Sequence, residues 1–321
     1  MGWRPAPRTL PIWQLNMRSE SPGARVTWAR LLARGLPSGW LRFCSVCLLL
    51  YSAEAEEPRL KTATLMPLWS PQAQFAGIYV GIDQGIYARH GLDLKVLRAG
   101  PGVSPPEALT NGTADFAVLW LTTALRHRDR GAPLVHLAQF VQRSSILLVS
   151  RKSSGIQSVA DMDGRKVGMW GGDLSIPPNA LFARQGIRVH EVPQAHTINL
   201  FLRGGIEVAS AMSYNEYHTL LSSGVDAGEL NVVSLSEEGL NFPEDGLYAL
   251  ETTVRRDPAL VSSFITATFE GWRRAFEKPE LAIDSVLRRM REARIPANRV
   301  HQQWMLGRME DLLKPAAPGA R

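Results

Sequence analysis

Short apolar runs alternate with segments of helical periodicity along most of the chain after residue 60. Runs such as 115–119 and 146–150 have the length and apolar content of buried strands, whereas apolar positions between 72 and 82 fall on one face of a helix, which is expected to end over 85–91. The last third of the chain is strongly helical in pattern, over 258–277, 279–292 and 297–313. Strands and helices that alternate without a long linker predict an α/β fold with mostly parallel sheets.

The first predicted strand ends in a polar turn that is a candidate binding site. Trp69, Gln72 and Gln74 follow the short strand 64–66 directly. In open α/β sheets, ligands bind where strands end. An indole offers a flat face for stacking, and amides offer both donors and acceptors, so this turn suits a planar heteroaromatic ligand. The alternative is that Trp69 fills the core.

Two more tryptophans follow predicted strands. Trp120 comes directly after the apolar run 115–119, and it is either a second stacking residue or a core residue. Trp170 lies in the glycine-rich segment 168–173, whose free backbone N–H groups could bind a polar ligand edge. Asp173 in the same segment opposes a dianion, which favours a neutral or zwitterionic ring. A plain connecting turn is the alternative.

Acidic and amide side chains occupy two further junctions. Asn215 and Glu216 begin a predicted helix after the strand 208–212, where a carboxylate could accept from a ligand amine or ring N–H. The alternative is a capping box between Ser213 and Glu216. Glu244, next to Asp245, precedes the predicted strand 246–251, and either acid could meet a ligand amino group or lie in a solvated turn.

The basic charge of the chain is concentrated at its start. The sequence has 321 residues and a formal charge of +6, yet residues 1–55 hold seven Arg and two Glu, leaving 29 basic and 28 acidic residues for the remainder. The charge therefore gives no indication of nucleic-acid binding. The length favours two α/β lobes over one small core.

Residues 1–55 have the pattern of a leader. An apolar run over 40–53 is followed by Ala53-Glu54-Ala55, which predicts a secretory signal peptide cleaved after Ala55. A membrane anchor is the alternative, although the run is short for a full span. Both cysteines lie in this leader, so the mature part has no disulfide or thiolate metal site. Since the histidines are also scattered, we expect no metal and no cofactor.

Three segments carry a family resemblance: LWSPQAQFAGIYVGIDQGIYARHGLDL at 68–94, the Lys-Val-Gly of 166–168, and AMSYNEYH at 211–218. They resemble periplasmic substrate-binding proteins of the sulfonate, taurine and thiamine-pyrimidine superfamily, and most closely the formylaminopyrimidine- and riboflavin-type branch. The resemblance implies an α/β, two-lobed type II periplasmic binding protein fold with a ligand cleft between the lobes. Lobe one would comprise residues 59–148 plus 248–321, and lobe two 149–247.

This resemblance also implies a function. The protein would be the periplasmic substrate-binding component of an ABC importer, a monomer that closes on a small ligand and delivers it to a membrane permease. The implied ligand is a thiamine-pyrimidine precursor, with a flavin, taurine or another sulfonate left open. The implied ligand-binding residues are those introduced above: Trp69, Gln72, Gln74, Trp120, Trp170, Asn215, Glu216 and Glu244.

An enzyme is the main competing interpretation. Thiamine-pyrimidine synthases share this fold and, in that family, use a cysteine-rich iron motif and a lysine in the cleft to make the pyrimidine from pyridoxal phosphate and histidine. The part of this chain after residue 55 has no cysteine, and its lysines do not fall at the matching strand end. We therefore expect a binding protein without catalytic residues. A receptor ectodomain of the same fold is a third possibility.

Overall fold

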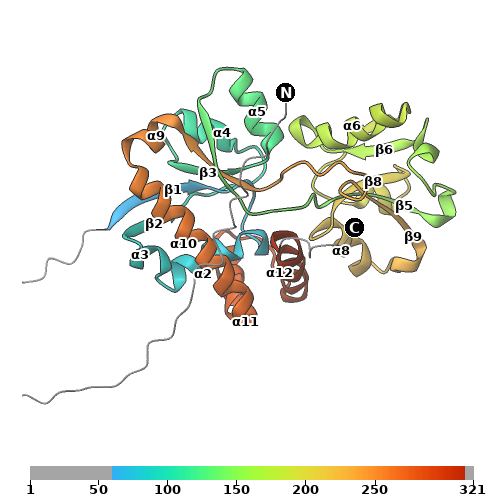
Figure 1. Ribbon diagram of the computed structural model, residues 1–321. Helices are drawn as coiled ribbons and strands as arrows, with labels where there is room; N and C mark the ends of the chain where they lie inside the picture. The colour runs from blue at the N-terminus through green and yellow to red at the C-terminus, as the bar shows by residue number, and fades with distance from the viewer. Residues whose placement is uncertain (1–59, 315–321) are drawn as a thin grey trace, which may run out of the picture. The chain divides into compact units, whose positions relative to one another are not determined.

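The computed structural model describes residues 60–314 (Figure 1). The predicted leader, its cleavage site and both cysteines lie outside the described residues. No helix within 60–314 combines the length and the apolar character needed to cross a membrane.

The strands form two five-stranded sheets, which we call the first and the second sheet. The first sheet has the order β2-β1-β3-β10-β4 and the second has the order β7-β6-β8-β5-β9. The strands of the first sheet are β1 (Lys61–Met66), β2 (Leu92–Val96), β3 (Phe116–Leu119), β4 (Leu134–Gln139) and β10 (Gly246–Leu250). Those of the second sheet are β5 (Ile146–Arg151), β6 (Lys166–Met169), β7 (His190–Pro193), β8 (Val208–Met212) and β9 (Leu230–Ser234).

One strand in each sheet runs opposite to the others. In the first sheet β10 is antiparallel to both β3 and β4, and in the second sheet β5 is antiparallel to both β8 and β9. The remaining four strands of each sheet share one direction, as the expected mostly parallel sheets require. Since β5 and β10 are the strands by which the chain enters the second sheet and returns to the first, segments 140–145 and 235–245 form two crossovers. The residue boundaries of the two lobes stay a prediction.

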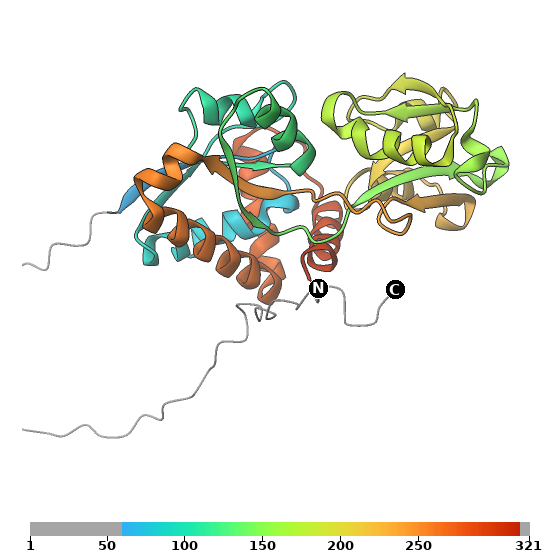
Figure 2. The same cartoon turned by 45° about the horizontal axis from the view of Figure 1, so that its top comes forward.

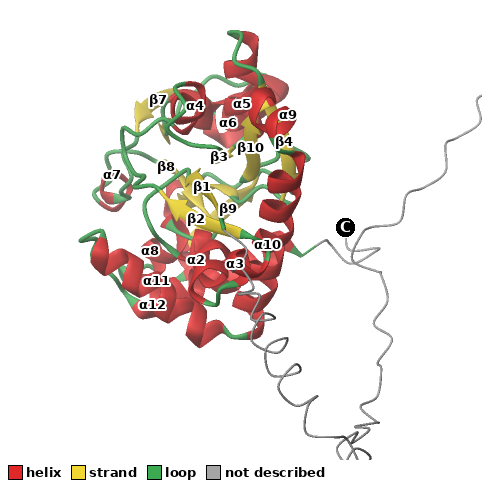
Figure 3. Ribbon diagram, turned by 90° about the vertical axis from the view of Figure 1, so that its left-hand side faces the viewer, coloured by secondary structure: helices red, strands yellow, loops and turns green. Residues whose placement is uncertain are grey.

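Helices cover both faces of the first sheet (Figure 3). One face packs on α2 (Ala76–Asp83), α3 (Ile86–Arg89) and the long α10 (Pro258–Glu277), and the other on α4 (Pro105–Thr110) and α5 (Leu121–Asp129). The single helix expected from 72 is broken. A 3₁₀ turn, Ala73–Phe75, precedes α2, and Gly85, with φ of +64°, separates α2 from α3, because a left-handed residue cannot continue a right-handed helix.

The contact between α2 and α10 depends on two glycines. A Cβ added to Gly271 would lie 2.3 Å from the carbonyl oxygen of Gly77, and one added to Gly77 would lie 2.4 Å from the ring of Trp272. Trp272 is buried in the core. The two helices therefore approach at backbone distance, and Figure 1 shows α10 alongside α2 and α3.

The remaining helices follow the order of the chain. Residues after β10 form α9 (Glu251–Arg256), then α10, α11 (Pro279–Glu292) and α12 (Arg299–Leu313). Asp257 accepts from the backbone N–H of Leu260 and so caps α10, with Pro258 in the first turn. The second sheet carries α6 (Ile176–Gln185), α7 (Asn199–Leu202) and α8 (Glu216–Ser222). In Figure 2 the yellow-green α6 lies over this sheet.

Candidate ligand-binding site

Two of the predicted site residues donate to one buried carboxylate, that of Asp245, and a third is linked to it through one of them. Gln74 Nε2 donates to Asp245 Oδ2 at 2.6 Å, and the indole nitrogen of Trp120 donates to Oδ1 at 3.1 Å. Gln72 Nε2 in turn donates to Gln74 Oε1 at 2.6 Å. All four residues are buried. The ends of β1 and β3 are thus joined to the second crossover, just before β10 begins.

Glu244 joins the two crossovers to each other. Its carboxylate accepts from the hydroxyls of Ser144 and Ser145, both at 2.6 Å, and from the backbone N–H of Ser145 at 2.9 Å. Burial raises the pKa of Glu244 to about 7 and that of Asp245 to about 6, although hydrogen bonds from their donors oppose the change. Both carboxyls therefore titrate near neutral pH.

Glu216 is the first residue of α8 and is also buried. Its Oε2 accepts from the backbone N–H of Met212 at 2.9 Å, and its Oε1 accepts from Asn215 Nδ2 at 2.8 Å. Burial raises the pKa of this carboxyl too. The alternative capping box with Ser213 does not form, because the N-cap residue is Asn215 and no side chain caps the helix.

Tyr214 lies within electrostatic reach of all three carboxyls. Burial is the main reason that the pKa of its phenol is raised, and negative charge on Asp245, Glu244 and Glu216 raises that pKa further. None of these three acids has an ion pair with a basic side chain among residues 60–314. The region is therefore rich in acceptors and lacks compensating positive charge, which favours a ligand with N–H donors and opposes an anion.

The two other predicted tryptophans, Trp69 and Trp170, take no part in this hydrogen-bond network among residues 60–314. Trp69 is partly buried, and its ring lies 5.4 Å from that of His196 in an edge-on arrangement. Trp69 also lines a cavity of about 480 Å³ together with Arg98 and Arg289. Trp170 is 9% exposed and, within the described part of the chain, has no hydrogen bond to the other candidates.

The glycine-rich segment after β6 is held by a contact that sequence reasoning did not foresee. Arg126 of α5 forms an ion pair with Asp173 in the short 3₁₀ helix Gly172–Ser175. Since α5 packs on the first sheet and this segment follows a strand of the second, the pair connects the two halves of the chain. The partner of Asp173 is thus a protein cation, 47 residues away.

Several residues of this region were not among the predicted site residues. Ser144 and Ser145 follow the polar pair 142–143, and the exposed His196, whose ring contacts Trp69, was not singled out either. Asp245 was considered only beside Glu244. The available signal was its place before the return strand, since strand ends face the ligand in open α/β sheets.

A family comparison decides the broader assignment. The model of the family described as NMT1/THI5 like matches residues 72–282. The chain belongs to this family. The match begins at Gln72, after Trp69, and ends in the first turn of α11, and it includes both crossovers and every hydrogen bond of Glu216, Glu244 and Asp245 described above.

Curated relatives of this NMT1/THI5-like chain include proteins of two kinds. A riboflavin-binding protein of Chloroflexus aurantiacus is 26% identical over 74% of this chain and 69% of the relative. A formylaminopyrimidine-binding protein of Halalkalibacterium halodurans is 22% identical over 82% of each chain. A 4-amino-5-hydroxymethyl-2-methylpyrimidine phosphate synthase of Legionella pneumophila is 24% identical over 73% of this chain and 75% of the relative.

Solved structures confirm the predicted fold class. The periplasmic aliphatic sulphonate-binding protein SsuA of Escherichia coli superposes with a TM-score of 0.62 at 17% identity, over 79% of this chain and 84% of that one. The fold is therefore α/β, two-sheeted and of the periplasmic binding protein type. At this identity the likeness speaks for the fold alone.

Proposed function

We propose that the protein is the substrate-binding component of an ABC importer and that it captures a small aromatic heterocycle with N–H donors. The observation that carries this proposal is the group of three buried carboxyls: Glu244 and Asp245 in the second crossover, and Glu216 at the start of α8. Each oxygen of Asp245 and Glu216 accepts one hydrogen bond from the protein, and a carboxylate oxygen can accept a second. An aminopyrimidine supplies such further donors on a flat ring.

Ligand binding would use the residues that the sequence singled out, with Asp245 added. Trp69 and Trp170 would stack on the ring, while Gln72, Gln74, Asn215, Glu216 and Glu244 would exchange hydrogen bonds with its edge. Trp120 would orient the Asp245 carboxylate through its indole N–H. Trp120 would thus act on the ligand indirectly, and the other side chains by direct contact.

The crossovers supply a physical route to closure. Glu244 links segment 140–145 to segment 235–245. A ligand that donates to these carboxyls would therefore favour the arrangement in which the two sheets close on it. We propose export to the periplasm, action as a monomer, and delivery of the ligand to a membrane permease. The names of the relatives that bind formylaminopyrimidine and riboflavin support this ligand class.

Calorimetric titration of the purified protein tests the proposal. Hydroxymethylpyrimidine or formylaminopyrimidine should bind with a Kd of roughly micromolar or tighter, which corresponds to about 8 kcal/mol. Taurine should not bind, because its sulfonate would meet uncompensated carboxylates. Asp245→Asn should weaken pyrimidine binding at least about tenfold, whereas Asp226→Asn, at an exposed turn, should leave it unchanged. Binding of taurine alone would show that the ligand class is wrong.

The relative named as a synthase favours one competing function. Incubation of the protein with pyridoxal phosphate and histidine, followed by mass spectrometry, distinguishes the two. Formation of a pyrimidine product would show that the protein is an enzyme and would contradict the proposal. Pyrimidine binding without any product would support it.

A further inference from the structure

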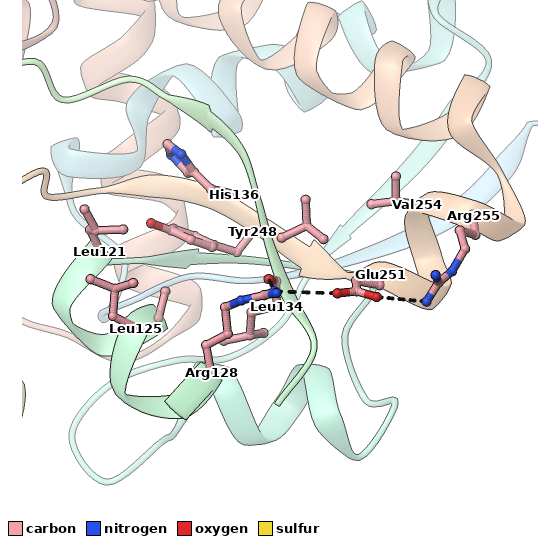
Figure 4. Close-up of a pocket in the computed structure, with 11 residues that line it drawn as sticks. Leu121, Leu125, Arg128, Leu134, His136, Tyr248, Glu251, Val254 and Arg255 are labelled. Carbon is pink, nitrogen blue, oxygen red and sulfur yellow. Dashed lines mark hydrogen bonds and ion pairs between the residues drawn. The ribbon is translucent and has the colours of Figure 1, made fainter. Parts of the chain in front are cut away.

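A second cavity lies on the face of the first sheet that packs against α5. It has a volume of about 520 Å³ and is lined by α5, β4, β10 and α9 (Figure 4). The backbone N–H of Glu251, the first residue of α9, donates to the carbonyl of Pro133, just before β4. From there the cavity extends to Leu121, the first residue of α5, and neither Glu244 nor Asp245 is among the residues that line it.

The wall of this cavity is largely apolar. Leu121 and Leu125 of α5 line one side, Leu134 of β4 lies between, and Val254 of α9 lines the other side. Leu125 is 56% exposed, which is unusual for a large apolar side chain beside a hollow. Exposed apolar surface that borders a cavity is typical of a binding site. A volume of about 520 Å³ suits a small ligand.

A buried hydroxyl in the wall lacks a partner. Tyr248 of β10 is 1% exposed, and its phenol oxygen has no hydrogen bond among the described residues. Figure 4 shows this oxygen pointing along the cavity toward Leu121. Burial without a partner is unfavourable for a hydroxyl, and a ligand acceptor would relieve it. The site thus offers one directed donor within an apolar wall.

The rim carries an excess of positive charge. Arg255 Nη2 lies 2.9 Å from one oxygen of Glu251, and Arg128 Nη1 lies 3.6 Å from the other. Two guanidinium groups thus share one carboxylate, and both are more than half exposed. A second carboxylate can approach this rim with favourable charge, since guanidinium groups bind carboxylates with several N–H donors.

We propose that this cavity is a second ligand site, for a small aromatic carboxylate that carries a hydrogen-bond acceptor on its ring. The ring lies against Leu121, Leu125 and Val254, the acceptor receives the Tyr248 hydroxyl, and the carboxylate pairs with Arg128 and Arg255. This ligand differs from the N–H-rich heterocycle of the proposed function in charge and in place, so either proposal can fail without the other.

Titration with 3-(4-hydroxyphenyl)propionate tests the site, with its primary amide as the uncharged control. The acid should bind with a Kd of about 1 mM or below, and the amide at least about fivefold more weakly. Tyr248→Phe should weaken the acid at least about threefold without lowering the melting temperature, because the lost hydroxyl had no partner in the free protein. Arg255→Gln should weaken the acid but not the amide, and Leu125→Asp should weaken both.

Trp69→Ala separates this site from the proposed heterocycle site. Unchanged acid binding in that variant supports the proposal, and its loss would show that the acid binds near Trp69 instead. The proposal is overturned by the absence of saturable binding up to about 10 mM. It is also overturned if Tyr248→Phe and Arg255→Gln both bind the acid as tightly as the unchanged protein does.

Discussion

Nδ1 of His218 lies 2.8 Å from Nδ1 of His301, so one of these nitrogens must donate and the other accept. The direction follows from their neighbours. Asn215 gives its Nδ2 to Glu216, which leaves its Oδ1 to accept from His301 Nε2 at 2.9 Å. Nδ1 of His301 is then the acceptor, and His218 donates. Both rings are neutral. Together they connect α8, which lies between β8 and β9 in the chain, to α12.

This pair predicts a loss of stability in mild acid. Burial lowers the pKa of both histidines, and for His301 the neighbouring His218 lowers it further. The unfolded chain therefore takes up these protons first, near pH 6.5, so the stabilisation present above that pH is lost as the pH falls. The contribution of the histidine pair to the free energy of unfolding should therefore fall by on the order of 1 kcal/mol between pH 7.5 and about 5.5. It is measured with urea as the difference between the unchanged protein and a histidine variant, because the other titrating groups are common to both.

The histidine contribution can be isolated with two variants. His218→Gln should lack the histidine contribution, because the donor–donor conflict cannot arise, so its stability should rise relative to that of the unchanged protein as the pH falls. His190→Gln, at an exposed residue, serves as the control and should follow the unchanged protein. The same pH dependence in all three proteins would contradict the assignment.

Glu244 predicts a pH effect of opposite sign. Its pKa is raised from 4.5 to about 7, so the folded state keeps a proton that the unfolded state releases. The stabilisation is complete below about pH 4.5 and is lost as the pH rises to about 7. Glu244→Gln should remove most of this decline, which is on the order of 3 kcal/mol. The serine hydroxyls can rotate to donate or accept, so the variant should fold. Glu237→Gln, at an exposed residue, is the control, and an unchanged slope in Glu244→Gln would refute the shift.

The glycine contact between α2 and α10 predicts two opposite results from the same substitution. Gly271→Ala should destabilise the protein by about 2 kcal/mol or more, because the new methyl group would meet the carbonyl of Gly77. Gly307→Ala, in α12, has nothing within 4 Å and should stabilise by about 0.5–1 kcal/mol through helix propensity. Thermal unfolding measures both. Equal effects would mean that α2 and α10 do not pack at backbone distance.

Trp69 should contribute to ligand affinity through its ring. Trp69→Ala should weaken pyrimidine binding by about 1–3 kcal/mol, the scale of a lost stacking platform, and Trp69→Phe should restore part of it. Because Trp69 is only partly buried, the melting temperature of the free protein should change little. Tryptophan fluorescence during titration provides an independent readout. If Trp69→Ala binds as tightly as the unchanged protein, Trp69 lies outside the site.

The elements of the fold were largely accessible from sequence, and the contacts of the site were not. Apolar runs such as those of β3 and β5 are local signals that a single stretch of sequence carries. In contrast, the partners of Asp245 are 171 and 125 residues away, and His218 and His301 are 83 residues apart. Periodicity carries no information on which distant side chains meet. The break between α2 and α3 was missed because the apolar pattern continues across Gly85, although its backbone does not.

Glu216→Gln should reverse the direction of the whole chain of hydrogen bonds that ends at His218. The glutamine oxygen can still accept from the backbone N–H of Met212, but its amide nitrogen then faces Asn215 and donates. Asn215 must rotate its amide so that Oδ1 accepts, which turns Nδ2 toward His301. His301 must then accept at Nε2 and donate from Nδ1.

This reversal makes a specific spectroscopic prediction. The ¹⁵N shifts of His301 should change from those of the Nε2–H tautomer to those of the Nδ1–H tautomer, while exposed His190 keeps its shifts. Stability should change by no more than about 1 kcal/mol, because every partner is retained. If Glu216 also accepts from the ligand, pyrimidine affinity should fall more than about tenfold in the same variant. An unchanged His301 tautomer would show that Asn215 does not couple Glu216 to the histidine pair.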